Sequence, residues 1–275
     1  MKVLITGGSG FIGYHLSNYL LKKKHKILSI LRTNKKKIVN KNIKYLFCDI
    51  ESIDNHISKV EIFKPEVIIH LAWDKIPDFT EKNSKKNYLN SCKLIDSVNK
   101  ISSVKKIIIS GSCLEKKKTN KNNKYFAKYK TLLRKFAFRT IKKKRIYWLR
   151  IYYIFGKGQR LKSLIPYVIK NFKKKQKFKI KNIDAYNNYI FISDFNDAIG
   201  NLLSTKYKSQ IFDLKGNFNI PNYNICKFIE YQFNKKNIIY SKKFKKNIKN
   251  KNNYKIPNWK PKVSIFSGIK KVINN

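Results

Sequence analysis

The segment from Thr6 to Gly13 (TGGSGFIG) constrains the fold of this chain more than any other feature. An apolar run, Lys2 to Ile5, leads into it, and from Phe11 to Leu21 the apolar residues recur at helical spacing. The sequence therefore predicts a strand, a glycine turn and a helix. Glycines permit a tight turn there, and the N-terminus of the helix presents free N–H groups to phosphate oxygens. We expect this segment to hold the pyrophosphate of a nicotinamide dinucleotide.

Short apolar runs then alternate with segments of helix length. Strands are expected at Ile27–Leu31, Ile43–Phe47, Val67–Leu71, Ile107–Ser110 and Tyr147–Ile151, and helices near 51–63, 82–99 and 126–143. This alternation is typical of right-handed β-α-β crossovers. It predicts an α/β fold, with a Rossmann-type doubly wound parallel sheet in a dinucleotide-binding domain over residues 1–155.

The pattern changes after about residue 155. Helices are expected near 163–174, 194–204 and 222–234, and short strands near 177–181, 189–192 and 210–214. These shorter elements predict a smaller C-terminal substrate-binding lobe over residues 156–275, with some elements returning to the sheet. The stretch from 242 to 253, nearly all Lys and Asn, is expected to form a solvated loop.

The chain carries 63 Lys and Arg against 15 acidic residues, a formal net charge of +48. Such a field attracts anionic ligands and favours weak, salt-dependent association with nucleic acid. The cations are spread along the whole chain rather than gathered in one stripe, and Asn, Ile, Tyr and Phe are also abundant. This pattern favours coding bias on tolerant surface positions, so we expect no specific nucleic-acid partner.

Four cysteines lie far apart, with no CxxC pair and no His at metal-ligand spacing, which predicts neither a disulfide framework nor a zinc site. The chain starts directly on an apolar strand, and no apolar run approaches the roughly 18 residues of a membrane-spanning helix. We expect a cytoplasmic protein with no membrane partner.

The TGxxGxxG form of the opening turn resembles the extended short-chain dehydrogenase/reductase family, in particular the NAD-dependent epimerase/dehydratase group that acts on nucleotide sugars. Further family-like segments follow in order: Cys48-Asp49-Ile50, His70-Leu71-Ala72-Trp73, Ser110-Gly111-Ser112, Arg150 with Phe155-Gly156-Lys157-Gly158-Gln159, Tyr189 to Asp194, and Trp259-Lys260-Pro261. The resemblance covers the whole chain. It implies NAD(P)-dependent hydride transfer at a sugar carbon of a nucleoside-diphosphate sugar, by a reductase, epimerase or dehydratase.

The same resemblance assigns residues to the cofactor. They are Gly7, Ser9, Gly10, Phe11, Ile12, Gly13, Arg32, Asp49, Ile50, Leu71, Ala72 and Lys130. Arg32 ends the second strand, where NAD-specific members place an acidic residue, and a guanidinium pairs well with a 2′-phosphate. We therefore favour NADP(H), with NAD(H) as the alternative if Arg32 is one more surface cation.

In this family a Ser orients the sugar oxygen, a Tyr phenol exchanges the proton, and a Lys four residues later lowers the pKa of the phenol. Ser112 and Lys130 match this pattern, but the tyrosine register falls on Phe126, which has no proton to give. Three explanations stay open: Tyr125 substitutes, another group or water carries the proton, or the protein is a catalytically degenerate regulatory or RNA-binding relative. We favour the set Ser112, Tyr125 and Lys130.

The resemblance also assigns substrate-binding residues: Trp73, Asn87, Gly156, Gln159 and Arg160. Arg160 is expected to meet the diphosphate, the alternative being a plain surface arginine. Family likeness further implies a homodimer formed through a four-helix bundle and a role in envelope polysaccharide biosynthesis.

Overall fold

The computed structural model describes residues 1–274 apart from 34–36, 117–119, 181, 240–248 and 252–255. The chain forms two compact units. The first comprises Met1–Ile151 and Gly200–Asp213, and the second comprises Tyr152–Ile199 and Leu214–Asn275. The sequence predicted a boundary after residue 155, whereas the first segment of the first unit ends at Ile151. Residues 200–213 belong to the first unit again.

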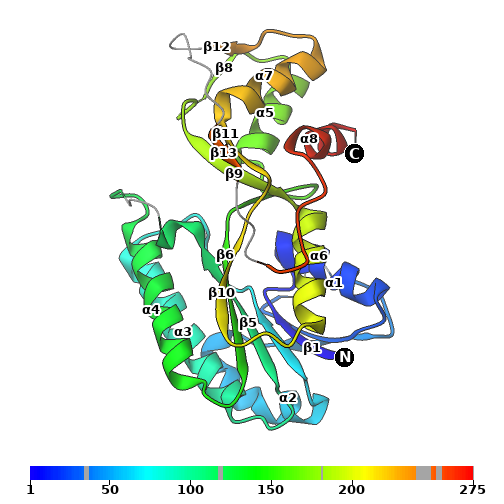
Figure 1. The fold of residues 1–275 in the computed structure, drawn as a ribbon, viewed down its shortest axis with the longest axis vertical. Coiled ribbons are helices and arrows are strands. Elements are labelled where there is room, and N and C mark those ends of the chain that lie inside the picture. The colour runs from blue at the N-terminus through cyan, green and yellow to red at the C-terminus, as the bar shows by residue number, and fades with distance from the viewer. Residues whose placement is uncertain (34–36, 117–119, 181, 240–248, 252–255, 275) are drawn as a thin grey trace. The chain divides into compact units, whose positions relative to one another are not determined.

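A seven-stranded sheet forms the centre of the first unit (Figure 1). Its strands are β1 (Lys2–Thr6), β2 (Lys26–Leu31), β3 (Ile43–Phe47), β4 (Val67–His70), β5 (Lys106–Ser112), β6 (Arg145–Ile151) and β10 (Gln210–Leu214). They lie in the order β10-β6-β5-β4-β1-β2-β3, and the pairs from β3 through β6 are parallel. The expected α/β fold with a doubly wound parallel sheet is confirmed, and the strand order reverses between β1 and β4.

Helices cover both faces of this sheet. They are α1 (Phe11–Lys22), the 3₁₀ helix η1 (Ile50–His56), α2 (Ile57–Phe63), α3 (Glu81–Asn99), the 3₁₀ helix η2 (Cys113–Glu115) and α4 (Lys124–Thr140). α3 and α4 lie on one side of the sheet and α1 on the other (Figure 1). Val60, Leu94 and Leu133 bring α2, α3 and α4 into one apolar core with the strands. This burial stabilises the layered arrangement.

The expected single helix over 51–63 is wrong in one respect. It begins as η1, which Asp49 caps by accepting a hydrogen bond from the Glu51 N–H at 3.1 Å, and Ser52 has non-helical φ and ψ. A regular α-helix starts only at Ile57. Capping by a short polar side chain favours such tight first turns.

The second unit has its own core. A sheet in the order β13-β11-β9-β7 contains β7 (Tyr153–Phe155), β9 (Tyr186–Phe191), β11 (Phe218–Pro221) and β13 (Lys249–Lys251), while β8 (Phe178–Lys179) pairs with β12 (Ile238–Ile239). The helices are α5 (Leu164–Lys173), α7 (Asn222–Phe233) and α8 (Ile265–Ile273), and α6 (Ile192–Ser204) runs from this unit into the first. The loop expected over 242–253 is wrong at β13, and its remaining residues lie outside the described part of the chain.

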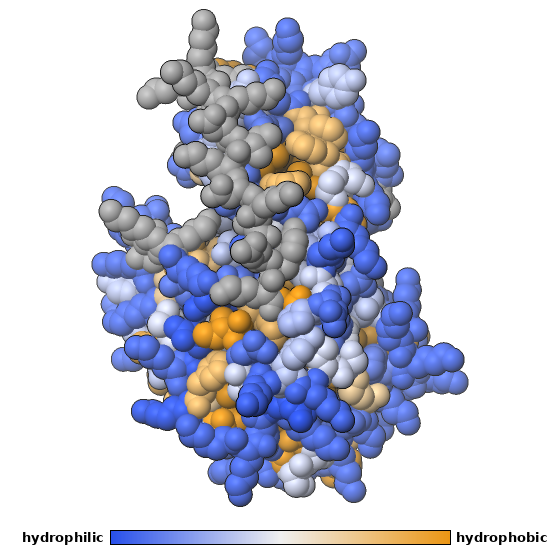
Figure 2. Space-filling view, viewed as in Figure 1, coloured by the Kyte–Doolittle hydropathy of each residue, from blue (hydrophilic) through white to orange (hydrophobic). Residues whose placement is uncertain are grey.

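Hydrophilic side chains cover most of the face that Figure 2 shows, as the spread of charge along the sequence predicts. All four cysteines are free thiols. None of the helices in the described residues combines the length and the apolar character that crossing a membrane requires.

Candidate functional site

The turn after β1 has the geometry of an anion-binding loop. Gly7 adopts a φ of +75°, and a Cβ on Gly13 would lie 2.2 Å from the Gly7 carbonyl oxygen, so neither position accepts a side chain without distortion. Gly10 is the N-cap of α1 and supplies no side-chain cap to the first-turn N–H groups. Those donors are therefore available to a phosphate.

A cavity of about 310 Å³ lies at the carboxyl ends of β1, β2, β3 and β4. It is lined by Gly7, Ser9, Gly10, Ile30, Leu31, Arg32, Thr33, Cys48, Asp49, Ile50, Leu71, Ala72, Trp73, Asp74, Asn83, Lys86, Asn87, Asn90 and Ser91. The carboxyl ends of the strands, at the point where their order reverses, are where open α/β sheets bind ligands.

Most of the residues expected to bind cofactor line this cavity. They are Gly7, Ser9, Gly10, Arg32, Asp49, Ile50, Leu71 and Ala72, and Trp73 and Asn87 join them from the expected substrate set. The described lining residues do not include Phe11, Ile12, Gly13, Ser112, Tyr125 or Lys130. Phe11, Ile12 and Gly13 belong to the first turn of α1, where their expected contribution is through main-chain N–H groups.

The other expected substrate residues belong to the second unit, where they follow β7. Gln159 donates from Nε2 to the Ile154 carbonyl oxygen at 2.9 Å, and its main-chain N–H donates to the Gly156 carbonyl at 3.3 Å. Arg160 donates from Nε to the Ser163 hydroxyl at 3.1 Å. Their structural partners are thus local.

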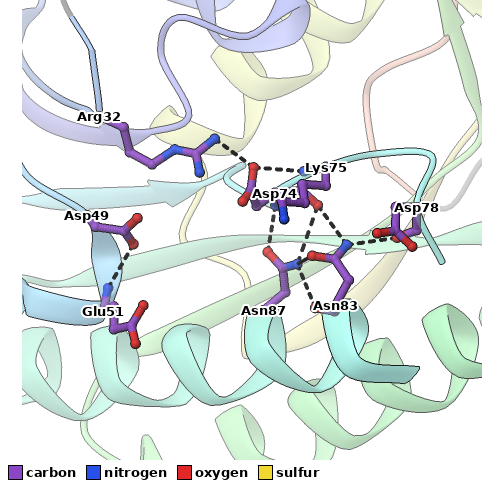
Figure 3. A network of polar contacts seen from close by, with 8 residues as sticks. All are labelled: Arg32, Asp49, Glu51, Asp74, Lys75, Asp78, Asn83 and Asn87. Atoms are coloured by element: carbon purple, nitrogen blue, oxygen red, sulfur yellow. Dashed lines mark hydrogen bonds and ion pairs between the residues drawn. The ribbon is translucent and has the colours of Figure 1, made fainter. Parts of the chain in front are cut away.

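Arg32 is paired with a carboxylate that the sequence did not reveal (Figure 3). Its Nη2 lies 2.6 Å from Oδ1 of Asp74, a residue that follows β4 and lines the same cavity. The pairing lowers the pKa of Asp74 and raises that of Arg32. The guanidinium that was expected to bind a 2′-phosphate is therefore already in contact with the carboxylate of Asp74.

One polar face of α3 supports the cavity. Asn83, Asn87 and Ser91 follow one another at intervals of four residues, are buried, and line the cavity together. The Ser91 hydroxyl is hydrogen-bonded to His70 Nε2 at 2.9 Å, and the other ring nitrogen, Nδ1, is hydrogen-bonded to Thr6 Oγ1 at 2.7 Å. Burial lowers the pKa of His70 to about 3, so this imidazole is a neutral link between β1, β4 and α3.

Of the lining residues in the described part of the chain, the sequence did not indicate nine: Ile30, Leu31, Thr33, Cys48, Asp74, Asn83, Lys86, Asn90 and Ser91. The spacing of polar side chains in α3 is a signal that could have indicated Asn83, Asn90 and Ser91, because they lie four residues before, three after and four after Asn87, and such positions share a helical face.

Ser112 ends β5 and is held by its neighbours. Its Oγ accepts a hydrogen bond from the Leu114 N–H at 3.2 Å, which leaves the hydroxyl hydrogen to donate elsewhere. The buried Glu115 carboxylate accepts from the Ser112 N–H and from Trp148 Nε1, both at 2.9 Å, and from Arg134 Nε at 3.0 Å. These bonds fix the end of β5 and η2 relative to the sheet.

Lys130 is buried at 2% exposure. Its Nζ donates to the Ser110 carbonyl oxygen at 2.7 Å and lies 3.9 Å from the centroid of the Trp73 ring. Burial lowers the pKa of this ammonium to about 7, and the nearby Glu115 carboxylate opposes the shift. The Phe126 ring, in the family's tyrosine register, lies 5.9 Å from Nζ and packs on Trp73. Phe126 therefore has no hydroxyl group to present to the Lys130 ammonium.

Tyr125 lies in the first turn of α4, half-buried against the apolar core, with Lys124 Nζ 4.6 Å from its ring centroid. Among the described residues, no hydrogen bond joins its hydroxyl to Ser112 or Lys130. The assignment of Tyr125 as proton donor stays a prediction.

The known proteins that this chain resembles include several enzymes named for sugar nucleotides. Two curated relatives are each 25% identical and cover 78% of this chain and 74% of their own length: GDP-6-deoxy-D-talose 4-dehydrogenase of Aggregatibacter actinomycetemcomitans, over 231 residues, and CDP-abequose synthase of Salmonella muenchen, over 228. Among solved structures, dTDP-glucose 4,6-dehydratase of Bacillus anthracis in complex with NAD has a TM-score of 0.85 at 18% identity, covering 100% of this chain and 96% of the other. UDP-glucose 4-epimerase of Thermotoga maritima with UDP-glucose has a TM-score of 0.82 at 18% identity, covering 100% and 98%.

The structural neighbours show the shared fold, and their low identity carries no more than that. The family assignment rests on a sequence model described as the NAD dependent epimerase/dehydratase family, which matches residues 3–220. That span includes the glycine turn, every residue lining the cavity, Ser112 and Lys130. The chain belongs to the NAD-dependent epimerase/dehydratase family.

Proposed function

We propose that this protein transfers hydride between a nicotinamide cofactor and a sugar carbon of a nucleoside-diphosphate sugar. The observation that carries the proposal is the cavity of about 310 Å³, which opens beside the uncapped N-terminus of α1 at the point where the strand order reverses. Because one curated relative is named a sugar-nucleotide 4-dehydrogenase, we favour net oxidation or reduction over epimerisation or dehydration.

The residues present suit a dinucleotide. The N–H groups of the β1–α1 turn and of the first turn of α1 would hold the pyrophosphate, while Asp49 and Ile50 would border the adenine and Leu71 and Ala72 the second ribose. Arg32 favours NADP(H), because a guanidinium attracts a 2′-phosphate and no carboxylate stands in its place at the end of β2. When bound, the nicotinamide supplies or accepts the hydride.

The chain's own groups then position the sugar and move the proton. We assign Ser112 to donate its free hydroxyl hydrogen to the sugar oxygen, Lys130 to hold the cofactor, and Tyr125 to carry the proton. Trp73 and Asn87, which line the cavity, are assigned to the sugar nucleotide. The assignment of Gly156, Gln159 and Arg160 to the same ligand stays a prediction from the sequence.

The Tyr125→Phe variant tests the proton donor. We expect turnover to fall by about 10²–10⁴-fold, the usual contribution of a positioned acid or base, with the Kd for NADPH unchanged. Tyr129→Phe is the matched control, because Tyr129 lies on the same helix and its hydroxyl faces Glu81 Oε1 at 3.4 Å. If Tyr125→Phe turned over at the wild-type rate, a group other than Tyr125 would have to carry the proton.

A panel of 4-keto-6-deoxy sugars carried on GDP, CDP, dTDP and UDP tests the reaction itself. NADPH oxidation with at least one member is expected. Tight cofactor binding without oxidation of NADPH by any member would favour the alternative that Phe126 raised, a relative that has lost its chemistry.

We further infer, from family likeness, a cytoplasmic homodimer that supplies sugars for envelope polysaccharide. In the family such dimers form through a four-helix bundle. Sedimentation at physiological salt measures the mass directly, and a monomer at micromolar concentration would contradict the dimer.

A further inference from the structure

We propose that Asp74 sets how strongly this site distinguishes NADP(H) from NAD(H), by holding the guanidinium of Arg32. The inference rests on the proposed function, since it concerns the dinucleotide that the cavity would take. It assigns a role in specificity to a residue that would not itself need to contact the 2′-phosphate.

The two side chains meet from different strand ends across one cavity. Arg32 follows β2 and Asp74 follows β4, both line the cavity, and their Nη2 and Oδ1 atoms are 2.6 Å apart (Figure 3). β1 lies between β2 and β4 in the sheet, so the ion pair spans the strand that delivers the phosphate-binding turn. A dinucleotide bound along the strand ends would lie against this pair.

Asp74 is the fixed member of the pair. Its main-chain N–H donates to Asn87 Oδ1 at 2.6 Å, and its carbonyl accepts from Asn83 Nδ2 at 3.1 Å. Oδ1 also accepts from the Lys75 N–H at 2.8 Å. Asn83 and Asn87 are buried residues of α3, so the carboxylate stands on a rigid support.

Arg32 is the adaptable member. Its side chain is 55% exposed against 32% for Asp74, and its one hydrogen bond among the described residues is the one to Asp74. A partly exposed ion pair of this kind is weak, so a ligand of sufficient charge can compete for the guanidinium. Among the described residues, the other cation that lines the cavity is Lys86, whose Nζ is paired with Glu51 Oε2 at 2.7 Å.

A 2′-phosphate therefore meets a guanidinium that is partly neutralised. It must either displace Asp74 from Arg32 or share the guanidinium with a like charge, and both alternatives weaken the charge-assisted contact. NAD(H) carries no phosphate there and meets neither cost. Asp74 thus lowers the affinity for NADP(H) and leaves the affinity for NAD(H) unchanged. The preference of the site for NADP(H) over NAD(H) is therefore smaller than it would be without this carboxylate.

The test compares Kd values for NADPH and NADH, measured by fluorescence titration at one ionic strength, across matched variants. Asp74→Asn keeps the shape and the Oδ1 acceptor for the Lys75 N–H while removing the charge. Asp78→Asn is the control, since this carboxylate lies in the same connection between β4 and α3, accepts from the Thr80 N–H at 3.0 Å, and does not line the cavity. The set is completed by Arg32→Leu and the double variant Arg32→Leu/Asp74→Asn.

We expect Asp74→Asn to bind NADPH roughly tenfold more tightly and to bind NADH within about twofold of wild type. Asp78→Asn should leave the ratio of the two Kd values unchanged. In the Arg32→Leu background, Asp74→Asn should lose its effect on NADPH, because the carboxylate acts through the guanidinium.

The inference would be overturned by an equal change in both Kd values, by the same gain in Asp78→Asn, or by a gain that persists without Arg32. If the wild-type protein bound neither dinucleotide, the proposed function would fail and the inference with it. Binding of both by every variant at wild-type affinity would refute the inference while leaving the proposed function intact.

Discussion

The Gly10→Ala variant is expected to lose about 50-fold or more in affinity for NADPH while unfolding at nearly the wild-type temperature. Gly10 has φ −71° and ψ 165°, which any residue adopts, and an added Cβ would have one close neighbour, the Gly7 carbonyl oxygen at 3.2 Å. The Gly7 carbonyl must move by a few tenths of an ångström to admit the methyl group, and we expect this shift to cost the fold little. It projects beside the cavity at the N-terminus of α1, where the pyrophosphate would have to approach the main chain.

Gly13→Ala provides the contrast. Its Cβ would lie 2.2 Å from the Gly7 carbonyl oxygen and 2.8 Å from Gly8 Cα, both main-chain atoms, so α1 or the turn must move. We expect this variant to lose cofactor affinity and roughly 2 kcal/mol or more of stability. Paired Kd and thermal unfolding measurements separate the two effects, and wild-type NADPH affinity in Gly10→Ala would place the phosphate elsewhere.

Replacing Lys130 by Met should change how stability depends on pH. The pKa of Lys130 falls from 10.5 to about 7 on folding, because burial penalises the ammonium. Between these values the unfolded chain binds more protons than the folded one, so the free energy of unfolding rises with pH. Below pH 7 the full penalty is present. The wild-type protein should therefore become more stable from pH 7 toward pH 10, whereas Lys130→Met should lack this rise.

At pH 6 we expect Lys130→Met to be the more stable protein by on the order of 2 kcal/mol, after allowing for the lost bond to the Ser110 carbonyl. Cofactor-dependent turnover should be lost. Denaturant unfolding from pH 6 to 10 measures the difference, with Lys128→Met as control, since Lys128 lies on the same helix and is exposed. Parallel curves for wild type and Lys130→Met would show that the buried ammonium carries no such penalty.

The sequence predicted what depends on neighbouring residues. The apolar strand, the glycines and the amphipathic helix at the start of the chain all act within about 20 residues, and together they predicted the strand, turn and helix that the structure shows. The alternation of later strands and helices predicted a doubly wound sheet, because parallel neighbours require crossovers. The cap of η1 is local in the same sense, because Asp49 accepts a hydrogen bond from the N–H of Glu51, two residues later.

Features that depend on distant pairing were not predictable from one sequence. Arg32 and Asp74 are 42 residues apart in the chain. They make contact because β2 and β4 both end at the same edge of the sheet. Glu115 collects Ser112, Arg134 and Trp148 from three elements. Composition alone also misjudged 249–251, whose pairing with Phe218 and Asn219 in β11 makes a strand of residues that resemble a polar loop. Long-range hydrogen bonding overrode local propensity there.

We propose that the cavity beside the first turn of α1 binds a nicotinamide dinucleotide. Calorimetric titration of the purified full-length chain with NADPH, and separately with NADH, measures this most directly. We expect saturable binding of one dinucleotide per chain with Kd in about the micromolar range, tighter for NADPH. Absence of heat and of saturation with both dinucleotides would contradict the account.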